Sequence, residues 1–236
     1  MRKVILSLAC AACAISASAQ RASSSSFFST EKVDNPLTIG IRAGGNLSTF
    51  TGDYFNDVDL KSRFGFNVGV NFDYSIMECF GVQTGVYFTT KGAKEERENF
   101  YTNYASTSTE EYNPMYIQIP VLASFRYNLN DDWRWELNAG PYFAFGVGGK
   151  YKYERTTTSI HDGDVIQHQE SEQDFFGDDI KSFDMGIALG TGLTYKKFYF
   201  GVQYEIGMTD MNNAKDDPDY ASIKNNNFTF SVGYNF

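Results

Sequence analysis

The sequence has few of the residues on which metal sites and disulfide scaffolds depend. Its 236 residues include only three cysteines, two histidines and five prolines. Cys10 and Cys13 fall in a predicted signal peptide, so the mature chain keeps only Cys79 and can form no internal disulfide. Because no ligand spacing typical of a metal site occurs, we expect neither a metal ion nor a cofactor.

Long apolar runs are also missing. The mean hydropathy is −0.37, and no stretch of about 18 apolar residues is present, which is the length that a membrane-spanning helix needs. Residues 1–19 instead have the parts of a secretory signal peptide: a charged start, a short apolar core at 4–15, and small residues at 17–19 before a cleavage point. Residues 20–36, with a run of serines and no periodicity, are predicted to be a flexible periplasmic lead-in.

Aromatic residues and glycine are abundant, with 16 tyrosines, 21 phenylalanines and 21 glycines. From Leu37 onward they fall into segments in which apolar and polar or small residues alternate, the period of a two-faced β-strand. Phe228, Phe230 and Val232 oppose Thr229 and Ser231, for example. Each segment has about the 9–11 residues that a tilted strand needs to cross a bilayer. The eight segments are 37–47, 64–74, 80–90, 116–127, 133–145, 183–195, 198–208 and 227–236.

The connections between these segments alternate in length. Short turns occur at 75–79, 128–132 and 196–197, whereas the long connections are 49–63, 91–115, 146–182 and 209–226. This alternation is typical of bacterial outer-membrane barrels, which have short periplasmic turns and longer outside loops. The predicted fold is all-β, a transmembrane eight-stranded antiparallel up-and-down β-barrel over residues 37–236. We expect it in the bacterial outer membrane, with both termini periplasmic.

Aromatic residues of the apolar face gather at the ends of the short turns. In an outer-membrane barrel they would form a girdle at the periplasmic interface, and the members are Tyr74, Phe80, Tyr127, Trp133, Tyr195, Phe198 and Phe236. The alternative, a soluble eight-stranded barrel or sandwich, would have to place many Phe and Trp side chains in an interior with little room. The expected partners are outer-membrane lipid and the barrel-assembly machinery, which would engage the C-terminal strand.

Three short motifs carry a resemblance to a known family. They are 116–122 (YIQIPVL), 139–142 (AGPY) and 184–187 (DMGI) with the glycines that follow. On these residues the chain resembles the PorT-like, OmpA-type outer-membrane β-barrel family of Bacteroidota, also described as porin family proteins, over essentially all of 37–236. The resemblance implies the barrel fold and supplies no catalytic residues. It also allows a role as a non-catalytic accessory of a secretion or uptake complex.

If the apolar face meets lipid, the other face lines the lumen and contains charged side chains. We expect these to form a structural network that fills the lumen, because an eight-stranded barrel is filled by its side chains. Across the turn at 128–132 the sequence predicts that Arg126 lies opposite Arg134, with Glu136 nearby. A narrow passive channel is the alternative. The expected network consists of Arg42, Asp73, Arg126, Arg134, Glu136, Asp184 and Glu205.

The third long connection contains a hairpin signal. Asp162-Gly163 is a strong two-residue turn and predicts the tip of an extracellular hairpin from about Gly148 to Asp174. Folding about this turn would pair Arg155 with Glu170, along with Ile160–Val165 and Tyr153–Glu172. His161 and His168 lie in the same connection, where a solvated acidic tip explains them better than a metal cluster does.

The chemistry points to interaction rather than catalysis. The net charge is −9, and the four long connections carry 20 acidic and 11 basic residues, so the charge resides on the loops. Acidic loops argue against nucleic acid as a partner. No strand contains histidine, so an enzyme is not expected. We expect a role in surface interaction, adhesion or envelope structure, with an extracellular or envelope protein or glycan as the candidate partner.

Overall fold

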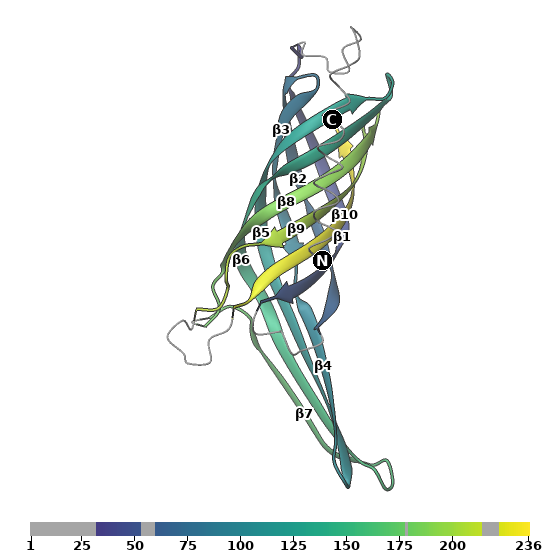
Figure 1. Ribbon diagram of the computed structural model, residues 1–236, viewed down its shortest axis with the longest axis vertical. Coiled ribbons are helices and arrows are strands. Elements are labelled where there is room, and N and C mark those ends of the chain that lie inside the picture. The colour runs from purple at the N-terminus through teal and green to yellow at the C-terminus, as the bar shows by residue number, and fades with distance from the viewer. Residues whose placement is uncertain (1–31, 53–59, 178, 214–221) are drawn as a thin grey trace, which may run out of the picture.

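The computed structural model describes residues 32–52, 60–177, 179–213 and 222–236. The predicted signal peptide and most of the lead-in, residues 1–31, lie outside the described residues. Across the described part of the chain, no helix is long and apolar enough to cross a membrane. The described residues form ten strands (Figure 1): β1 (Leu37–Thr51), β2 (Leu60–Met77), β3 (Phe80–Thr90), β4 (Ala93–Phe100), β5 (Tyr104–Asn128), β6 (Trp133–Ser159), β7 (Val165–Asp174), β8 (Phe183–Tyr195), β9 (Phe198–Gly207) and β10 (Lys224–Asn235).

Eight of these strands close into an antiparallel barrel. The order around it is β1-β2-β3-β5-β6-β8-β9-β10, and β10 pairs with β1 to complete the ring. The closing ladder runs from Gly40↔Asn235 to Thr51↔Lys224 without a register shift. Closure leaves no strand of the ring with an unpaired edge, which a bilayer requires. The eight predicted segments are these eight strands, so the predicted fold is confirmed.

The two ends of the barrel differ. One end, called here the short-turn end, holds the turns β2–β3, β5–β6 and β8–β9, together with Pro36 and Phe236. The other, the long-loop end, holds the four long connections. The seven aromatics predicted for the girdle all lie at the short-turn end, where Trp133 and Tyr195 have ring centroids 4.7 Å apart. Their role at a membrane interface stays a prediction.

Most of the connection 91–115, predicted as a solvated loop, forms further sheet at the long-loop end and joins the predicted hairpin. β5 and β6 have 25 and 27 residues and continue well past the barrel. β4 pairs with the outer part of β5, and β7 pairs with the outer part of β6. Together they make a four-stranded sheet of order β7-β6-β5-β4, which projects from the barrel in Figure 1 and is called the extension below.

The hairpin predicted in the third connection exists, but its pairing was wrong. Arg155 lies opposite Gln169 rather than Glu170, and Tyr153 lies opposite Ser171 rather than Glu172. The turn runs from Ser159 to Asp164, longer than the two residues that Asp-Gly suggests, and a register shift lies beside Thr158. A one-residue slip moves every side chain of a strand to the other face.

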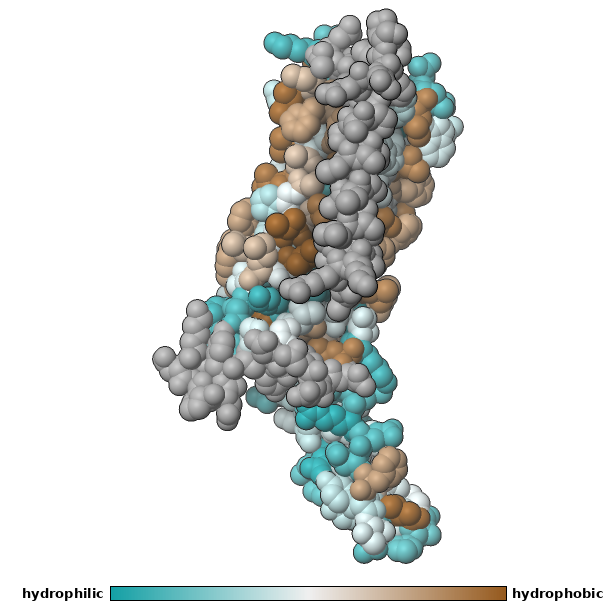
Figure 2. Space-filling view, in the orientation of Figure 1, coloured by the Kyte–Doolittle hydropathy of each residue, from teal (hydrophilic) through white to brown (hydrophobic). Residues whose placement is uncertain are grey.

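The barrel is apolar outside and polar inside. Large apolar side chains of alternating positions are exposed, such as Phe64 at 71% and Phe230 at 53%. The residues between them are buried and polar, including Asn71, Ser124 and Asn227. Figure 2 shows hydrophobic side chains over the barrel and mostly hydrophilic ones over the extension. This distribution is the reverse of a soluble protein's and fits strands that face lipid.

Candidate functional site

The lumen near the short-turn end is filled by an ion-pair layer. Arg126 pairs with Asp73 and is 1% exposed. Gln83 donates from Nε2 to Asp73 Oδ2 at 3.1 Å and to Glu136 Oε1 at 3.0 Å. The predicted juxtaposition of Arg126 with Arg134 was wrong, because the turn shifts the register and places Arg126 opposite Glu136. Opposite charges therefore face each other where like charges were expected.

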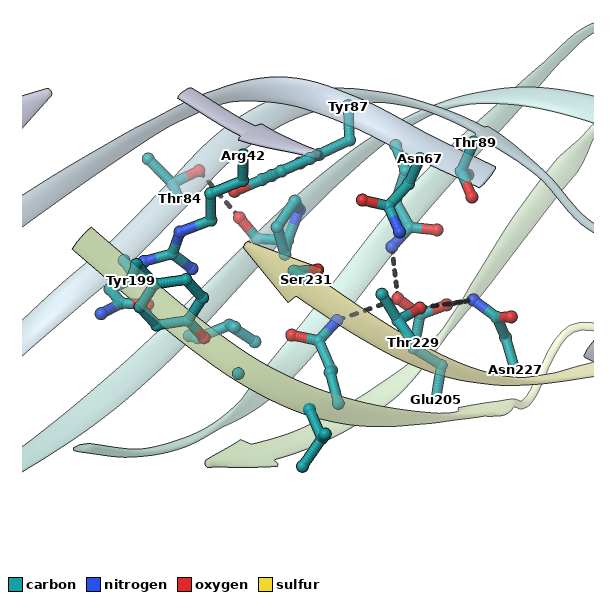
Figure 3. A pocket seen from close by; sticks show the side chains of 17 residues that line it. Arg42, Asn67, Thr84, Tyr87, Thr89, Tyr199, Glu205, Asn227, Thr229 and Ser231 are labelled. Atoms are coloured by element: carbon teal, nitrogen blue, oxygen red, sulfur yellow. Dashed lines mark hydrogen bonds between the residues drawn. The ribbon is translucent and has the colours of Figure 1, made fainter. Parts of the chain in front are cut away.

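Arg42 completes this layer from the other side of the barrel. Its guanidinium carbon lies 3.7 Å from the centroid of the Tyr199 ring (Figure 3), and its Nη2 lies 3.9 Å from Glu136 Oε1. Stacking of this kind suits the flat guanidinium in a site with little water. Arg134, also predicted for the network, lines the hollow at the short-turn end instead.

A second layer lies near the long-loop end and is centred on Lys91. Its Nζ lies 3.0 Å from Glu205 Oε2 and 3.8 Å from Asp184 Oδ2, and all three side chains are at most 2% exposed. The same Nζ lies 4.4 Å from the centroid of the Tyr142 ring. The structure thus divides the predicted network, placing Asp184 and Glu205 in this layer and the other residues of the set toward the short-turn end.

Lys91 was missed from the sequence because it was assigned to a long connection. The lumen-facing positions of β3 are odd-numbered, with Gln83, Tyr87 and Thr89 among them, so two more residues of alternation lead to Lys91. The same extension of β10 toward its start leads to Asn225, which is also buried. The alternation of β3 and β10, continued by two residues, therefore predicts that Lys91 and Asn225 face the lumen.

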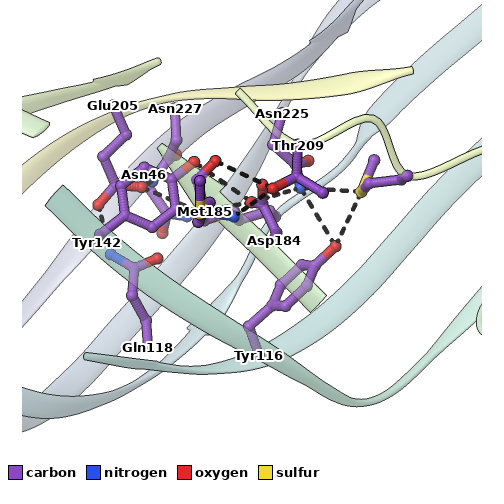
Figure 4. A network of polar contacts seen from close by, with 12 residues as sticks. Asn46, Tyr116, Gln118, Tyr142, Asp184, Met185, Glu205, Thr209, Asn225 and Asn227 are labelled. Atoms are coloured by element: carbon purple, nitrogen blue, oxygen red, sulfur yellow. Dashed lines mark hydrogen bonds and ion pairs between the residues drawn. The ribbon is translucent and has the colours of Figure 1, made fainter. Parts of the chain in front are cut away.

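Neutral side chains donate hydrogen bonds to the carboxylates of the second layer (Figure 4). Asn225 donates to Asp184 Oδ2 at 3.0 Å, and Tyr142 donates to the same oxygen at 3.3 Å. Gln118 donates to Glu205 Oε1 at 2.6 Å. Buried carboxylates are costly unless paired and hydrogen-bonded, and these satisfy both conditions.

Between the two layers the lumen contains a small cavity of about 50 Å³, lined by Arg42 and Tyr87 on one side and Glu205 and Asn227 on the other. A water needs about 10–15 Å³ of such volume, so the cavity has room for only a few.

Above the second layer, an apolar cluster covers the lumen at the long-loop end. It comprises Phe50, Ala93, Phe175 and Met211, each at most 7% exposed. Side chains thus occupy the lumen at three levels.

Comparison with known proteins identifies the family. A family model described as "Outer membrane protein beta-barrel domain" matches residues 18–213. The chain belongs to this family. It is therefore an integral outer-membrane protein, and the eight strands of its ring carry the exposed apolar bands. The match ends before β10, the strand that closes the ring.

Several solved structures are similar to this outer-membrane barrel. Ail, the attachment invasion locus protein of Yersinia pestis, has 16% identity, covers 86% of this chain and 100% of its own, and has a TM-score of 0.37. OprG of Pseudomonas aeruginosa has 10% identity, covers 87% of this chain and 98% of its own, and has a TM-score of 0.39. The Neisserial surface protein A has 12% identity, 86% and 100% coverage, and a TM-score of 0.34. No curated protein sequence gives a significant match.

The extension carries several exposed ion pairs. On one face, Glu96 pairs with Lys61 and also with Lys94, at 2.8 Å. Hydrogen bonds from these two lysines lower the pKa of Glu96 to about 2. Lys150 lies 3.0 Å from Asp174 on the same face. On the extension, cross-strand pairs of opposite charge take the place of the apolar residues that the barrel exposes. This composition suits a sheet that is exposed to solvent.

The predicted hairpin tip is at the outer end of the extension. Gly163 has φ of 77°, a conformation that favours glycine, and Gly163 N donates to Ser159 O at 3.1 Å. A hydrogen bond from the side chain of Ser159, with a second from the backbone of Asp164, lowers the pKa of Asp162. His168 Nδ1 lies 3.1 Å from Thr156 Oγ1. Among the described residues, no three His, Cys, Asp or Glu side chains lie close enough to hold a metal ion.

Proposed function

We propose that this protein acts at the cell surface, as an interaction or adhesion protein that presents the extension to an extracellular protein or glycan. The short-turn end, with Pro36 and Phe236, lies in the periplasm, and the long-loop end lies outside, because long connections face outward in barrels of this membrane. The observation that carries the proposal is the filled interior: two ion-pair layers occupy the lumen, which leaves the extension as the part that acts.

The outer end of the extension supports a binding role. It carries six large apolar or aromatic side chains, between 36% and 76% exposed, in an otherwise charged and polar sheet; this distal patch consists of Phe100, Tyr101, Tyr104, Ile160, Val165 and Ile166. The two tips are joined by a hydrogen bond from Ile160 N to Asn103 O at 3.1 Å. Figure 2 shows hydrophobic atoms at this end. Apolar patches rimmed by polar residues mark interaction sites.

A truncation tests this function while keeping the barrel. Residues 96–109 and 154–170 are each replaced by Asn-Gly, which joins two opposed pairs, Glu95↔Glu110 and Tyr153↔Ser171, through tight turns. Cells that display the full chain, the truncated chain or neither are compared for retention on immobilised matrix glycoproteins and on fixed cells. Folding is checked by heat-modifiable gel mobility, and surface amount by labelling.

We expect the full chain to increase retention and the truncated chain to return it to the level of cells without the protein. The pair Phe100→Ser with Ile166→Ser should lower retention in the same direction, because it removes apolar area from the distal patch alone. Full retention by the truncated chain would contradict the proposal. The accessory role that the PorT-like resemblance implies gives a different result, recovery of envelope proteins with the barrel by affinity capture from native membranes.

A further inference from the structure

At the base of the extension, the structure contains a cleft that neither the barrel nor the distal patch explains. Its volume is about 430 Å³, within the range of about 300–1,000 Å³ that is usual for small-molecule sites. It lies at the long-loop end, between the extension and the ends of the barrel strands. Its walls come from β1, β5, β6 and β7 and from residues just after β7 and β9 and just before β10.

Four aromatic rings line the cleft and pack against one another. Tyr112 and Tyr151 have ring centroids 5.2 Å apart, and Phe50 lies 5.6 Å from Tyr112. Phe175 lies 6.2 Å from Phe50, and both phenylalanines are buried. Mutual packing fixes the rings, so the aromatic wall exists before any ligand arrives.

The charges that line the cleft are all negative. The Tyr112 and Tyr151 hydroxyls both donate to Glu110 Oε2 at 2.8 Å, and this pair of bonds orients the carboxylate beside the rings. Asp179 also lines the cleft, and so does Asp174, although the Asp174 carboxylate is paired with Lys150 at 3.0 Å; none of the described lining residues is Lys, Arg or His. The Glu110 carboxylate also acts on Glu95, the residue opposite it on β4: burial raises the pKa of Glu95, Arg97 lowers it, and Glu110 raises it.

We propose that this cleft binds a small amphipathic organic cation, a protonated amine on an aromatic or branched apolar body. The rings contact the apolar body and attract the ammonium through their negative faces. Glu110 supplies the charge-assisted hydrogen bond that orients the ligand. An anionic ligand of the same shape meets the carboxylates of Glu110 and Asp179 and is excluded. This site is separate from the surface interaction proposed above, since truncation of the distal patch leaves all four rings and Glu110 in place.

Calorimetry on the purified full chain tests this assignment. The protein is held in a non-ionic detergent, because zwitterionic detergents carry a quaternary ammonium group that would compete. The probes are 2-phenylethylammonium, the neutral 2-phenylethanol and the anion 3-phenylpropionate. We expect saturable one-to-one binding of the cation, weaker binding of the alcohol and none of the anion. Equal binding of all three probes, or no binding of the cation, would overturn the proposal.

Variants locate the binding site. Glu110→Gln should weaken the cation about tenfold, the loss of one charged contact, and leave 2-phenylethanol unchanged. Glu170→Gln is the matched control, since Glu170 is exposed and lies on the face of β7 opposite Gln173, which lines the cleft. Asp179→Asn removes the other cleft carboxylate and should also weaken binding of the cation, so it tests the site if Glu110→Gln fails to fold. If Glu110→Gln folds and binds the cation as the wild type does, or if Glu170→Gln weakens it equally, the assignment is wrong.

Discussion

Replacing Lys91 by methionine should destabilise the barrel far more than the loss of an ordinary lysine. Lys91→Met keeps most of the side-chain volume but leaves two buried carboxylates, on Glu205 and Asp184, without their cation. Breaking a buried ion pair from one side costs about 3–5 kcal/mol, because the remaining charge stays uncompensated. With a slope of about 2 kcal/mol per M, this lowers the urea midpoint by about 1.5–2.5 M.

The assay is urea unfolding of the protein folded in lipid vesicles, followed by the fluorescence of its two tryptophans. Lys152→Met is the control, because Lys152 is 48% exposed and pairs with Glu172 at the surface, where such pairs contribute about 0–1 kcal/mol. Combining Lys91→Met with Glu205→Gln should recover much of the loss, since the nearest uncompensated charge is then gone.

A loss below about 1 kcal/mol for Lys91→Met would refute the reasoning, because it would place the cost of the unpaired carboxylates near that of a surface pair. A double variant no more stable than Lys91→Met alone would also contradict it. In that case the loss would come from side-chain packing against Tyr142 and Tyr116 rather than from charge.

Three further predictions concern other parts of the chain. Gly81→Val should destabilise the folded barrel by about 1–3 kcal/mol in the same urea assay, because a Cβ at this position would lie 2.6 Å from Arg126 Nη2. Glu96 should titrate near pH 2 by NMR. Because the folded pKa of Glu96 is depressed, its stabilising contribution is present above about pH 4.5 and is lost as the pH falls through about 2. An unshifted titration would contradict the pairing of Glu96 with two lysines. Arg155→Cys with Gln169→Cys should form a disulfide in a cysteine-free background, whereas a disulfide formed more readily one residue further along β7 would support the register that the turn motif suggests.

The barrel could be predicted from the sequence because lipid imposes a simple pattern. Each membrane strand must put apolar residues outward at every second position, so the alternation predicts the number of strands. Only closure removes unpaired edges, so the same strands are predicted to form a ring. β7 and the part of β4 beyond Glu95 are exposed on both faces, and their sequences, such as Val165–Asp174, contain no apolar alternation. Nothing in the periodicity separates such a strand from a charged loop.

The candidate site was harder to predict because it depends on register. The Asp162-Gly163 motif suggested a two-residue turn, yet the chain uses a longer one and the charged partners shift by one position. At the other end of the barrel, the turn between β5 and β6 brings Glu136 rather than Arg134 opposite Arg126. The carboxylates and arginines were identified by face, but which of them pair depends on turn geometry, and Lys91 fell just outside the predicted strand.

Conductance of the purified wild-type protein in planar bilayers tests the central claim most directly, namely that this barrel acts outside the membrane rather than through it. With Arg126–Asp73 and Lys91–Glu205 across the lumen and an apolar cluster above them, we predict no discrete conductance steps above those of the bilayer alone. Steady ohmic steps that scale with the amount of inserted protein would contradict the closed lumen and favour a narrow passive channel.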